Sequence, residues 1–527
     1  MLTDRWPLAT AAEMRALDRH TTSALGVPGE LLMESAGQAL AAQALRLLPE
    51  RGGEVWAYCG AGNNGGDGFV VARLLQLRGV RARIVLVADR ARFTPEAAAN
   101  FARAERAGVA LAKGAAPRGS VIVDAIFGIG LARKVEGALA RAIRRINASR
   151  PSCRVLAVDV PSGVDADTGQ VHGVAVQADV TLTIGLPKLG LTQEPARSLA
   201  GEIVVARIGI ADAAPGVALA AECWTRAAAA RALPARPRAG HKGSFGHVLI
   251  AGGSRGKAGA AALAARGAAR GGAGLVTVAC PRGQNAILQR TSVEAMTAPL
   301  AESGRGTFAR AAEEELLELA RARGALVLGP GCGRDAETRA ALRAFALAAP
   351  GPLVLDADGL VAFEGRAGEL RGRRAPTLLT PHPGEAGLLL GLTPRAVNAA
   401  RPALARELAK ETGAVVVLKG AGSAIAAPDG ALAVNPTGGP VLGTGGTGDV
   451  LAGLAGALLA QRVPIFEAAA LATFVHGAAG DLVASRRGSR GSLASEIADA
   501  IPEALRELAA PQREIGAGDA IRFPQPG

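Results

Sequence analysis

The chain has 527 residues, of which 49% are hydrophobic and 20% charged, so it can bury at least two cores and lacks the signature of a disordered protein. Its formal charge is +13, but 52 of the 59 basic residues are arginines scattered among alanines, and only 3% of residues are aromatic. This composition argues against a nucleic-acid partner, because bases find few side chains to stack on.

Five widely spaced cysteines form no CxxC pair, which indicates reduced thiols and a cytoplasmic protein. They are Cys59, Cys153, Cys223, Cys280 and Cys332. No signal peptide is expected at the start of the chain, and no uncharged apolar stretch approaches the roughly 20 residues that cross a bilayer. The sequence therefore predicts no membrane partner.

Short apolar runs alternate with helical segments in the first part of the chain. These runs are residues 55–59, 82–87, 121–124, 155–159 and 180–184. Runs of this length between helices are typical of a mainly parallel sheet that is covered on both faces. We predict a doubly wound α/β domain with a Rossmann-like parallel sheet over residues 1–220.

A glycine-rich loop follows the first of these runs. Gly60, Gly62 and Gly65 satisfy the GxGxxG pattern of dinucleotide-binding domains, and by itself this pattern suggests an NAD-dependent dehydrogenase. The loop also contains Asn63-Asn64 and Asp67, at positions that usually stay small or apolar in that pattern. These polar side chains predict contact with a polar ligand, whereas a capped strand-to-helix turn is the simpler alternative.

Two further strands end in aspartates, Asp124 and Asp159. A buried carboxylate without a partner is costly, so each needs a cation, a donor or a ligand hydroxyl. Oxygen donors without histidine or cysteine favour a hard cation, and Asn64, Asp124 and Ser162 could supply one coordination shell. Because ligands bind beyond the carboxyl ends of parallel strands, we expect these residues to lie close to the glycine-rich loop.

Residues 221–240 contain Pro234, Pro237 and Gly240, and we predict a linker there. The alternation then resumes with apolar runs at residues 248–251, 275–278, 326–328, 353–356, 377–379 and 415–418. These runs predict a second doubly wound α/β domain over residues 241–510, followed by a tail of residues 511–527. The two halves share an architecture without sharing a repeated sequence.

The segment Gly443 to Asp449, GTGGTGD, is the most informative part of the second half. Its glycines let the backbone approach a ligand, and the apolar helix that follows directs its N–H groups and positive dipole end at the same point, as in phosphate sites. A carboxylate there would repel phosphate, so Asp449 indicates proton transfer or metal binding. A glycine-rich turn with an aspartate in the first helical turn is the structural alternative.

Other strands of the second half also end in glycine or charge. Lys419 begins the glycine-rich run Lys419 to Ser423, and His382 stands between two prolines that hold it in an extended segment. No GxSxG or GxxxxGK[ST] motif occurs, which disfavours a serine hydrolase and a P-loop nucleotide hydrolase.

Together these motifs resemble those of the bifunctional NAD(P)H-hydrate repair enzymes, in which an NAD(P)HX epimerase is fused to an ADP/ATP-dependent NAD(P)HX dehydratase. The resemblance covers nearly the whole chain and depends on motifs in both halves. These are residues 63–68, 124–134, 159–163, 241–243 with 246–250, 272–276, the His382 segment and the GTGGTGD loop. It implies a ribokinase-like α/β/α sandwich for the second domain.

The resemblance also implies site residues in the first domain. The contacts to the hydrated dinucleotide would come from Asn63, Asn64, Gly65, Gly66, Asp67, Gly128, Ile129, Gly130, Leu131, Ala132, Arg133, Lys134 and Asp159. Potassium would bind Asn64, Asp124 and Ser162. As a hypothesis, Asp159 moves the proton when the hydroxyl leaves the ring carbon next to nitrogen, which produces an iminium that water can rejoin from either face.

In the second domain, the resemblance implies hydrate contacts at Ala260, Gly331, His382 and Asp449. The nucleotide would contact Lys419, Gly420, Ala421, Gly422, Ser423 and Gly448, with Mg²⁺ in the same domain and ADP as co-substrate. As a hypothesis, Asp449 takes the proton of the hydrate hydroxyl while the terminal phosphoryl group transfers to it. The products from ADP would be NAD(P)H, AMP and phosphate.

Three alternatives stay open. The second half suits a sugar or vitamin kinase fused to a dinucleotide-binding domain, the first half suits a dehydrogenase, and the whole chain could be a nucleotide sensor without catalysis. The fusion of two domains resembles the form of the family that uses ADP, but the sequence does not decide ADP against ATP or NADHX against NADPHX. A homo-oligomer also stays open, as does substrate channelling between the sites.

Overall fold

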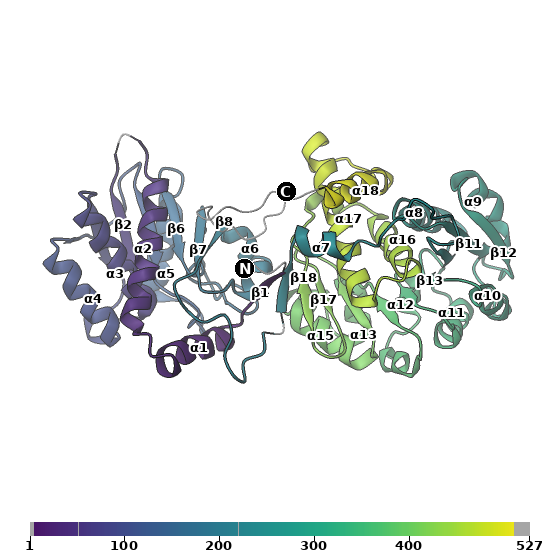
Figure 1. Ribbon diagram of the computed structural model, residues 1–527, viewed down its shortest axis with the longest axis horizontal. Helices are drawn as coiled ribbons and strands as arrows, with labels where there is room; N and C mark the ends of the chain where they lie inside the picture. The colour runs from purple at the N-terminus through teal and green to yellow at the C-terminus, as the bar shows by residue number, and fades with distance from the viewer. Residues whose placement is uncertain (1–4, 51, 220, 511–527) are drawn as a thin grey trace. The chain divides into compact units, whose positions relative to one another are not determined.

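The protein is described by a computed structural model that covers residues 5–50, 52–219 and 221–510. These residues form two compact units (Figure 1). The first contains residues 7–219 and 221, and the second contains residues 222–510 together with residues 5 and 6. The predicted tail at residues 511–527 lies outside the described residues.

The first unit contains a parallel sheet of seven strands in the order β4-β3-β2-β5-β6-β7-β8. The strands are β2 (Val55–Cys59), β3 (Ala82–Leu86), β4 (Ala110–Leu111), β5 (Val121–Ala125), β6 (Arg154–Val158), β7 (Val180–Ile184) and β8 (Glu202–Ala206). Every residue of β2 and β5 is buried, as expected for central strands with helices on both faces. The five predicted strands are all present, with bounds that shift by one residue at most.

Helices cover both faces of this sheet. The cores contain α2, α3 and α4 residues on one face and α5 residues on the other. The helical elements of the unit are α1 (Ala11–Arg19), η1 (His20–Ala24), α2 (Gly29–Leu47), α3 (Asn63–Leu77), η2 (Arg90–Arg92), α4 (Pro95–Arg106), α5 (Gly137–Ser149), η3 (Leu189–Thr192) and α6 (Ala196–Leu199). The doubly wound architecture predicted for this half is therefore confirmed.

The second unit is built around a longer sheet, ordered β1-β9-β18-β17-β16-β15-β14-β13-β10-β11-β12. Its strands are β1 (Arg5–Leu8), β9 (Ala221–Trp224), β10 (His247–Ala251), β11 (Leu275–Pro281), β12 (Met296–Leu300), β13 (Ala325–Leu328), β14 (Leu353–Leu355), β15 (Thr377–Leu379), β16 (Val415–Leu418), β17 (Ala424–Ala426) and β18 (Leu432–Val434). The strands from β10 to β16 pair in parallel, whereas β17 runs antiparallel to both β16 and β18.

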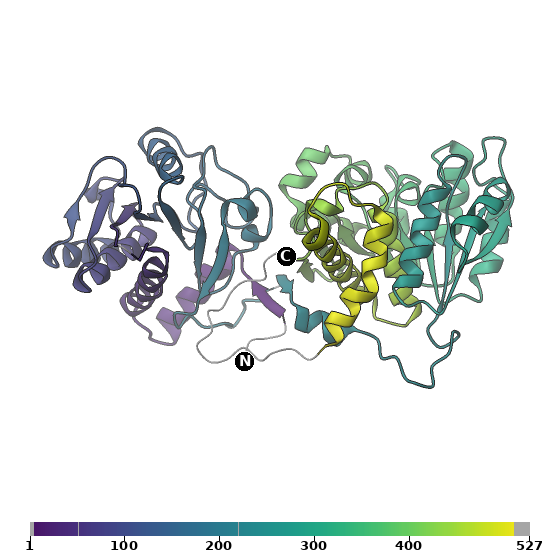
Figure 2. The same ribbon diagram turned by 90° about the horizontal axis from the view of Figure 1, so that it is seen from above.

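One large core lies between this sheet and α8, α16, α17 and α18 (Figures 1 and 2). The helical elements of the unit are α7 (Arg226–Ala232), α8 (Ala258–Arg270), η4 (Arg282–Gln284), α9 (Asn285–Thr291), α10 (Ala312–Ala320), α11 (Ala336–Ala348), α12 (Asp358–Val361), η5 (Ala367–Gly372), α13 (Pro383–Leu390), α14 (Pro394–Ala399), α15 (Arg401–Thr412), η6 (Pro440–Leu442), α16 (Thr447–Ala460), α17 (Ile465–Arg487) and α18 (Ala494–Ala509).

Part of the predicted linker forms regular structure. Residues 221–224 are strand β9, and residues 226–232 are helix α7, which Thr225 caps by accepting a hydrogen bond from the Ala228 N–H. Helix α7 packs against α17 and α18. An Ala/Arg run has little amphipathic pattern, so its residues do not indicate that this segment packs on a core.

Helix α17 is long and apolar enough to cross a bilayer by length and composition alone. However, 72% of its most apolar window is buried inside the unit, and Ala468 to Gly477 are buried without interruption. An apolar helix buried on all sides is also what a large soluble core requires. The segment is therefore explained as a core helix.

Each sheet contains one point where the strand order reverses. In the first sheet the reversal lies between β2 and β5, and in the second it lies between β10 and β13. Loops leave in opposite directions at such a point, which opens a crevice at the carboxyl ends of the two strands. In the first unit the predicted site loops follow β2, β5 and β6, at and next to this point. In the second unit Gly331 follows β13 at the reversal, whereas His382 and Lys419 follow β15 and β16, further along the sheet.

Helices α8 and α16 pack closely against each other, and glycine in α8 allows this contact. A Cβ at Gly267 would lie 2.3 Å from the carbonyl oxygen of Val450, so Gly267→Ala forces the two backbones apart. We expect the second unit to lose about 1–3 kcal/mol, measured by urea unfolding. Gly259→Ala in the same helix meets no atom within 4 Å and should gain about 0.5 kcal/mol. Equal stabilities for the two variants would contradict the packing argument.

Candidate functional site

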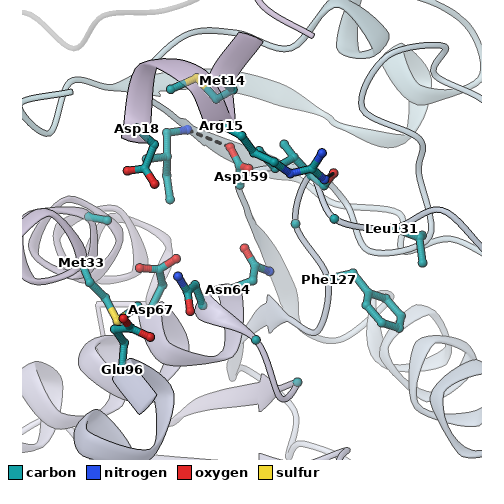
Figure 3. A pocket seen from close by; sticks show the side chains of 18 of the residues that line it. Met14, Arg15, Asp18, Met33, Asn64, Asp67, Glu96, Phe127, Leu131 and Asp159 are labelled. Atoms are coloured by element: carbon teal, nitrogen blue, oxygen red, sulfur yellow. Dashed lines mark hydrogen bonds between the residues drawn. The ribbon is translucent and has the colours of Figure 1, made fainter. Parts of the chain in front are cut away.

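A cavity of about 820 Å³ lies in the first unit at the carboxyl ends of β2, β5 and β6 (Figure 3). It therefore sits at the reversal of strand order. Its walls include many of the predicted site residues, namely Asn63, Asn64, Asp67, Gly128, Ile129, Gly130, Leu131, Arg133 and Asp159. The residues absent from its lining are Gly65, Gly66, Ala132 and Lys134.

The glycines of the first loop have a structural explanation. Helix α3 begins inside the loop, at Asn63, and a Cβ at Gly65 would lie 2.1 Å from the Gly60 carbonyl oxygen. A Cβ at Gly66 would meet the Met33 side chain at 2.8 Å. These glycines let α3 start against the strand ends, and the polar side chains between them can then face the cavity.

Asp67 is 7% exposed, and no hydrogen bond to its carboxylate occurs among the described residues. Burial, together with the negative charge of Asp159, raises the pKa of Asp67 well above its ordinary value. Figure 3 shows its carboxylate and that of Asp159 directed into the same space. The carboxyl group of Asp67 is therefore available to a ligand.

Asp159 is held in an unusual conformation directly after β6. Its φ of 67° lies in the left-handed region that residues other than glycine seldom adopt. Its Oδ1 accepts hydrogen bonds from the Ile184 N–H at 3.1 Å and from the buried ammonium of Lys188, which also donates to Thr183 Oγ1. A strained backbone and an ion pair together fix this carboxylate at the cavity wall.

The residues predicted to bind potassium lie beside the cavity. Asp124 and Ser162 are fully buried, and the Ser162 N–H donates to Asp124 Oδ2 at 2.8 Å. Burial raises the pKa of Asp124 to about 6, against the opposing effect of its hydrogen bonds to Ser162. The side-chain amide of Asn64 has a buried nitrogen without a partner, and its oxygen lies near Gly128. Asp124 and Ser162 are therefore bonded neighbours, and the Asn64 amide lies beside the same loop after β5.

Lys134 behaves differently from the other residues of its loop. Its ammonium pairs with Glu136 at 2.8 Å, and both side chains are about 70% exposed. The loop itself is fixed by Arg15, which donates to the Ile129 carbonyl at 2.9 Å. In this structure Lys134 and Ala132 lie in the loop without lining the cavity.

In the second unit, Asp449 lies in the first turn of α16, whose N-cap is Gly446 with a φ of 95°. The Lys419 Nζ lies 3.2 Å from the position that a Cβ at Gly448 would occupy. The structure therefore brings Lys419, Gly448 and Asp449 together at the amino end of α16. A helix N-terminus with an adjacent ammonium is suited to a phosphate group.

Lys419 is paired with other carboxylates, not with Asp449. Its Nζ donates to Asp356 Oδ1 at 2.9 Å and lies 3.9 Å from Glu385 Oε2. Burial opposes the charged ammonium, but the charges of Asp356 and Glu385 raise the pKa of Lys419 overall. Asp449 has no hydrogen-bond partner among the described residues, and burial together with the charge of Asp356 raises its pKa to about 7.

His382 has an extended backbone and is the N-cap of α13. Its Nδ1 accepts from the Gly384 N–H at 2.9 Å and from the Glu385 N–H at 3.3 Å, and Glu385 Oε2 accepts from the His382 N–H. Because Nδ1 is an acceptor, Nε2 carries the proton of the neutral ring. The capping contacts place Glu385 next to Lys419 and leave the His382 side chain 54% exposed.

The glycine-rich run 419–423 is closed by hydrogen bonds of its own. Ser423 Oγ accepts from the Gly420 N–H and donates to its carbonyl at 2.9 Å. The buried Arg401 donates to the Ala421 carbonyl at 2.6 Å. On the other side of the strand reversal, a Cβ at Gly331 would lie 3.0 Å from the Ala260 Cβ, so these two predicted contacts are neighbours.

Sequence reasoning missed four residues of these sites, namely Lys188, Asp356, Glu385 and Arg401. Lys188 is one of only seven lysines and follows a predicted strand, and Asp356 ends one, so both carried a signal. Glu385 follows His382 by three residues, but no role was predicted for it. Arg401 contacts the 419–423 loop from the start of another helix, and nothing in the sequence indicates that proximity.

Comparison with known proteins gives matches over both halves. The family model described as YjeF-related protein N-terminus matches residues 29–190, and the model for NAD(P)H-hydrate dehydratase matches residues 248–503. The bifunctional NAD(P)H-hydrate repair enzyme Nnr of Moorella thermoacetica is 40% identical over 519 residues, which cover 95% of this chain and 97% of that protein. The corresponding enzyme of Thermofilum pendens is 39% identical over 516 residues, with 95% and 96% covered.

Among solved structures, the chain is similar to the ADP/ATP-dependent NAD(P)H-hydrate dehydratase of Bacillus subtilis co-crystallized with ATP/Mg²⁺. The two are 29% identical with a TM-score of 0.47, and the match covers 54% of this chain and 98% of the other.

The raised pKa of Asp449 predicts a cost to stability. Its folded pKa of about 7 exceeds the ordinary value of 3.8, so the protonated form is favoured by folding and this preference is lost as pH rises through 7. We therefore expect the stability of Asp449→Asn relative to the parent chain to increase by on the order of 2 kcal/mol as the pH is raised from about 5 to about 8. Urea unfolding at both pH values measures this difference. A constant difference would show that Asp449 titrates normally.

Proposed function

Because this chain belongs to the family of bifunctional NAD(P)H-hydrate repair enzymes, we propose that its two units perform the two steps of that repair. The first unit interconverts the R and S forms of hydrated NADH and NADPH. The second dehydrates the S form and consumes a nucleoside diphosphate. The observation that carries this proposal is the position of Asp449 beside Lys419 at the amino end of α16, where none of the described residues pairs with its carboxylate.

The epimerase site is the cavity of the first unit. The hydrate contacts Asn63, Asn64, Asp67, the loop from Gly128 to Arg133 and Asp159, while Gly65 and Gly66 shape the start of α3. Loss of the hydroxyl from the carbon next to the ring nitrogen gives an iminium, and water returns to either face. Asp159 handles a proton in this exchange, since Lys188 fixes one of its oxygens and leaves the other for the substrate.

Potassium suits the oxygen donors beside this cavity. The buried amide of Asn64 has an atom without a partner, and its two ends are exchangeable by a flip, so an oxygen can be directed at a cation. Asp124 and Ser162 add a carboxylate and a hydroxyl. When bound, potassium would supply positive charge that keeps Asp124 ionised and orders the loop after β5.

In the dehydratase site, Asp449 removes the proton of the hydrate hydroxyl as its oxygen attacks the terminal phosphorus of ADP. The bond from that phosphorus to the bridging oxygen breaks, and AMP leaves. The N–H groups of α16 and the ammonium of Lys419 stabilise the charge on the transferring group. Departure of phosphate and loss of a proton from the adjacent ring carbon then restore NAD(P)H.

Around this reaction, the hydrate contacts Ala260, Gly331 and His382, and the nucleotide contacts the run Lys419 to Ser423 and Gly448. No three acidic, histidine or cysteine side chains converge as a metal site in the parts of the chain that the structure describes. Mg²⁺ needs only one or two carboxylates besides water and phosphate oxygens, which Asp356 and Glu385 can provide. When bound, Mg²⁺ would neutralise charge on the phosphates.

The five cysteines are buried and unpaired, which agrees with a reducing cytoplasm as the working compartment. The partners are small molecules, namely the hydrates of NADH and NADPH and the nucleotide.

The proposed function is tested with a mixture of R and S hydrates of NADH, incubated with the protein in the presence and absence of ADP. With ADP, we expect complete recovery of the near-ultraviolet absorbance of the reduced ring, since epimerisation feeds the R form into dehydration. Without ADP, only interconversion of the epimers should occur, and liquid chromatography monitors it. Transfer of phosphate to a stable acceptor, without recovery of NADH, would instead indicate a kinase.

Asp449→Asn separates the two activities. It should lower nucleotide-dependent dehydration of the S hydrate by roughly a hundredfold or more, since a positioned base is lost, while epimerisation stays unchanged. The epimerisation rate of the same variant is the internal control for folding. A dehydration rate within about threefold of the parent chain would refute the role of Asp449.

Potassium dependence is confined to the first unit in this proposal. Replacing potassium with tetramethylammonium should slow epimerisation by about tenfold or more, because altering only the groups around metal ligands already costs about 10- to 100-fold and loss of the ion should cost at least as much. Ser162→Ala should weaken the dependence and leave dehydration intact. Equal epimerisation rates in both salts would remove the cation from the proposal.

A further inference from the structure

Two carboxylates line the epimerase cavity, and their surroundings differ. Asp67 and Asp159 are each only 7% exposed, and both border the cavity. Asp67 comes from the first turns of α3, whereas Asp159 follows β6. Figure 3 shows the two carboxylates entering the same space from different elements. A ring bound between them would have an acidic side chain available on more than one side.

Asp159 is held by an ion pair and hydrogen bonds. Its Oδ1 accepts three hydrogen bonds, from the Lys188 ammonium, the Ile184 N–H and the Thr183 hydroxyl. Lys188 is fully buried, and its ammonium forms an ion pair with the Asp159 carboxylate. An ammonium buried against a carboxylate requires the carboxylate charge, because a lone buried cation is costly.

Lys188 itself is not positioned to give a proton to a ligand. Its Nζ donates to Asp159, to the Ile184 carbonyl at 2.6 Å and to the Thr183 hydroxyl at 3.2 Å. An ammonium has three donors, and these three acceptors engage all of them. Lys188 therefore orients Asp159 and acts on the substrate only through it.

Asp67 has the opposite surroundings. No cation pairs with it and no hydrogen bond reaches its carboxylate among the described residues, although the side chain is more than nine-tenths buried. Burial and the charge of Asp159 raise its pKa well above the ordinary value, which favours the neutral acid. Two carboxyl groups in one site, one ionised and one protonated, are a recurring arrangement for acid–base work.

We propose that Asp67 is the catalytic acid of the epimerase and that Asp159, oriented by Lys188, is its base. This inference rests on the proposed function of the first unit. It assigns Asp67 a chemical role beyond substrate contact, and it assigns Lys188 the role of a positioning residue.

Epimerisation by this route needs only the two carboxyl groups and water. The Asp67 O–H gives its proton to the hydroxyl oxygen of the hydrate, the carbon–oxygen bond breaks with its electron pair on oxygen, and water leaves. The lone pair of the ring nitrogen forms the iminium. A second water then forms the new carbon–oxygen bond on the other face and gives a proton to Asp159. One water enters and one leaves, and solvent returns the proton from Asp159 to Asp67.

Other titratable or charged groups also surround Asp67 and bear on its pH dependence. Those that line the cavity with it are Arg15, Asp18, Arg92, Glu96, Arg133, Asp159 and Lys188, and the elements packed against α3 contribute Glu34, Cys59 and Asp124 on their inner side. Of these, Glu34 is paired with Arg73, and burial keeps the pKa of the Cys59 thiol well above its ordinary value.

The test uses the full-length chain with Asp67→Asn, Asp67→Glu and, as a matched control, Glu105→Gln. Glu105 lies on α4 of the same unit, pairs with Arg90 and is 45% exposed. Epimerisation is started from the pure S hydrate of NADH without nucleotide, and the R form is quantified by chromatography. Hydrate affinity is measured by calorimetry, and dehydration with ADP in the same preparations reports on the second unit.

We expect Asp67→Asn to lower kcat for epimerisation by about a hundredfold or more, with the hydrate Kd within about threefold and dehydration unchanged. Asp67→Glu should recover part of the loss, and Glu105→Gln should match the parent chain. In the parent chain kcat should fall as pH rises through the raised pKa of Asp67, and this alkaline decline should be absent from Asp67→Asn.

Several outcomes would overturn the inference. They are an Asp67→Asn kcat within about threefold of the parent chain, or a loss explained by weaker hydrate binding alone. If Asp67→Asn does not fold, the parent chain decides, and a kcat that is flat or rising across the alkaline range refutes an acid role. Failure of the proposed function would look different, because then the parent chain and the control would also lack epimerisation.

Discussion

One ammonium faces more negative charge than it can neutralise at the amino end of α16. Lys419 donates a hydrogen bond to Asp356 at 2.9 Å and lies near Glu385, and Asp449 has no partner in the described part of the chain. The uncompensated carboxylate has a pKa raised to about 7, where a base can both accept and release a proton near neutral pH. If Lys419 paired with Asp449 instead, that carboxylate would be an anion fixed in a salt bridge and a poor base.

The epimerase cavity uses the same principle with fewer groups. All three donors of the Lys188 ammonium are engaged by Asp159 and the residues next to it, so the Asp159 carboxylate has a cationic partner. Asp67 has none among the described residues, and burial together with the charge of Asp159 raises its pKa. In both sites a lysine pairs with neighbouring carboxylates and leaves one carboxylate available to a ligand. The available carboxylate is the one to which we assign chemistry, Asp449 in the dehydratase and Asp67 as the acid of the epimerase.

These pairings depend on the parallel sheets. Asp124 ends β5, and Asp159, Asp356 and Lys419 directly follow β6, β14 and β16, so all four lie at the carboxyl ends of parallel strands. Helices α3 and α16 then start at these strand ends, where glycines such as Gly65 admit close contact with the preceding loop. The cost of burying charge is met there by backbone N–H groups and ion pairs brought from distant parts of the chain.

The sequence alone determined the doubly wound class of both units, the five predicted strands of the first sheet and the strand ends where the polar residues cluster, because hydrophobic periodicity and glycine are local signals. It also identified the family through motifs such as GTGGTGD. It could not show that residues 221–232 form a strand and a helix, that Lys188 pairs with Asp159, or that Lys419 leaves Asp449 unpaired. Only the tertiary structure decided these, because burial and charge pairing depend on which distant segments meet, and neither is encoded by local spacing.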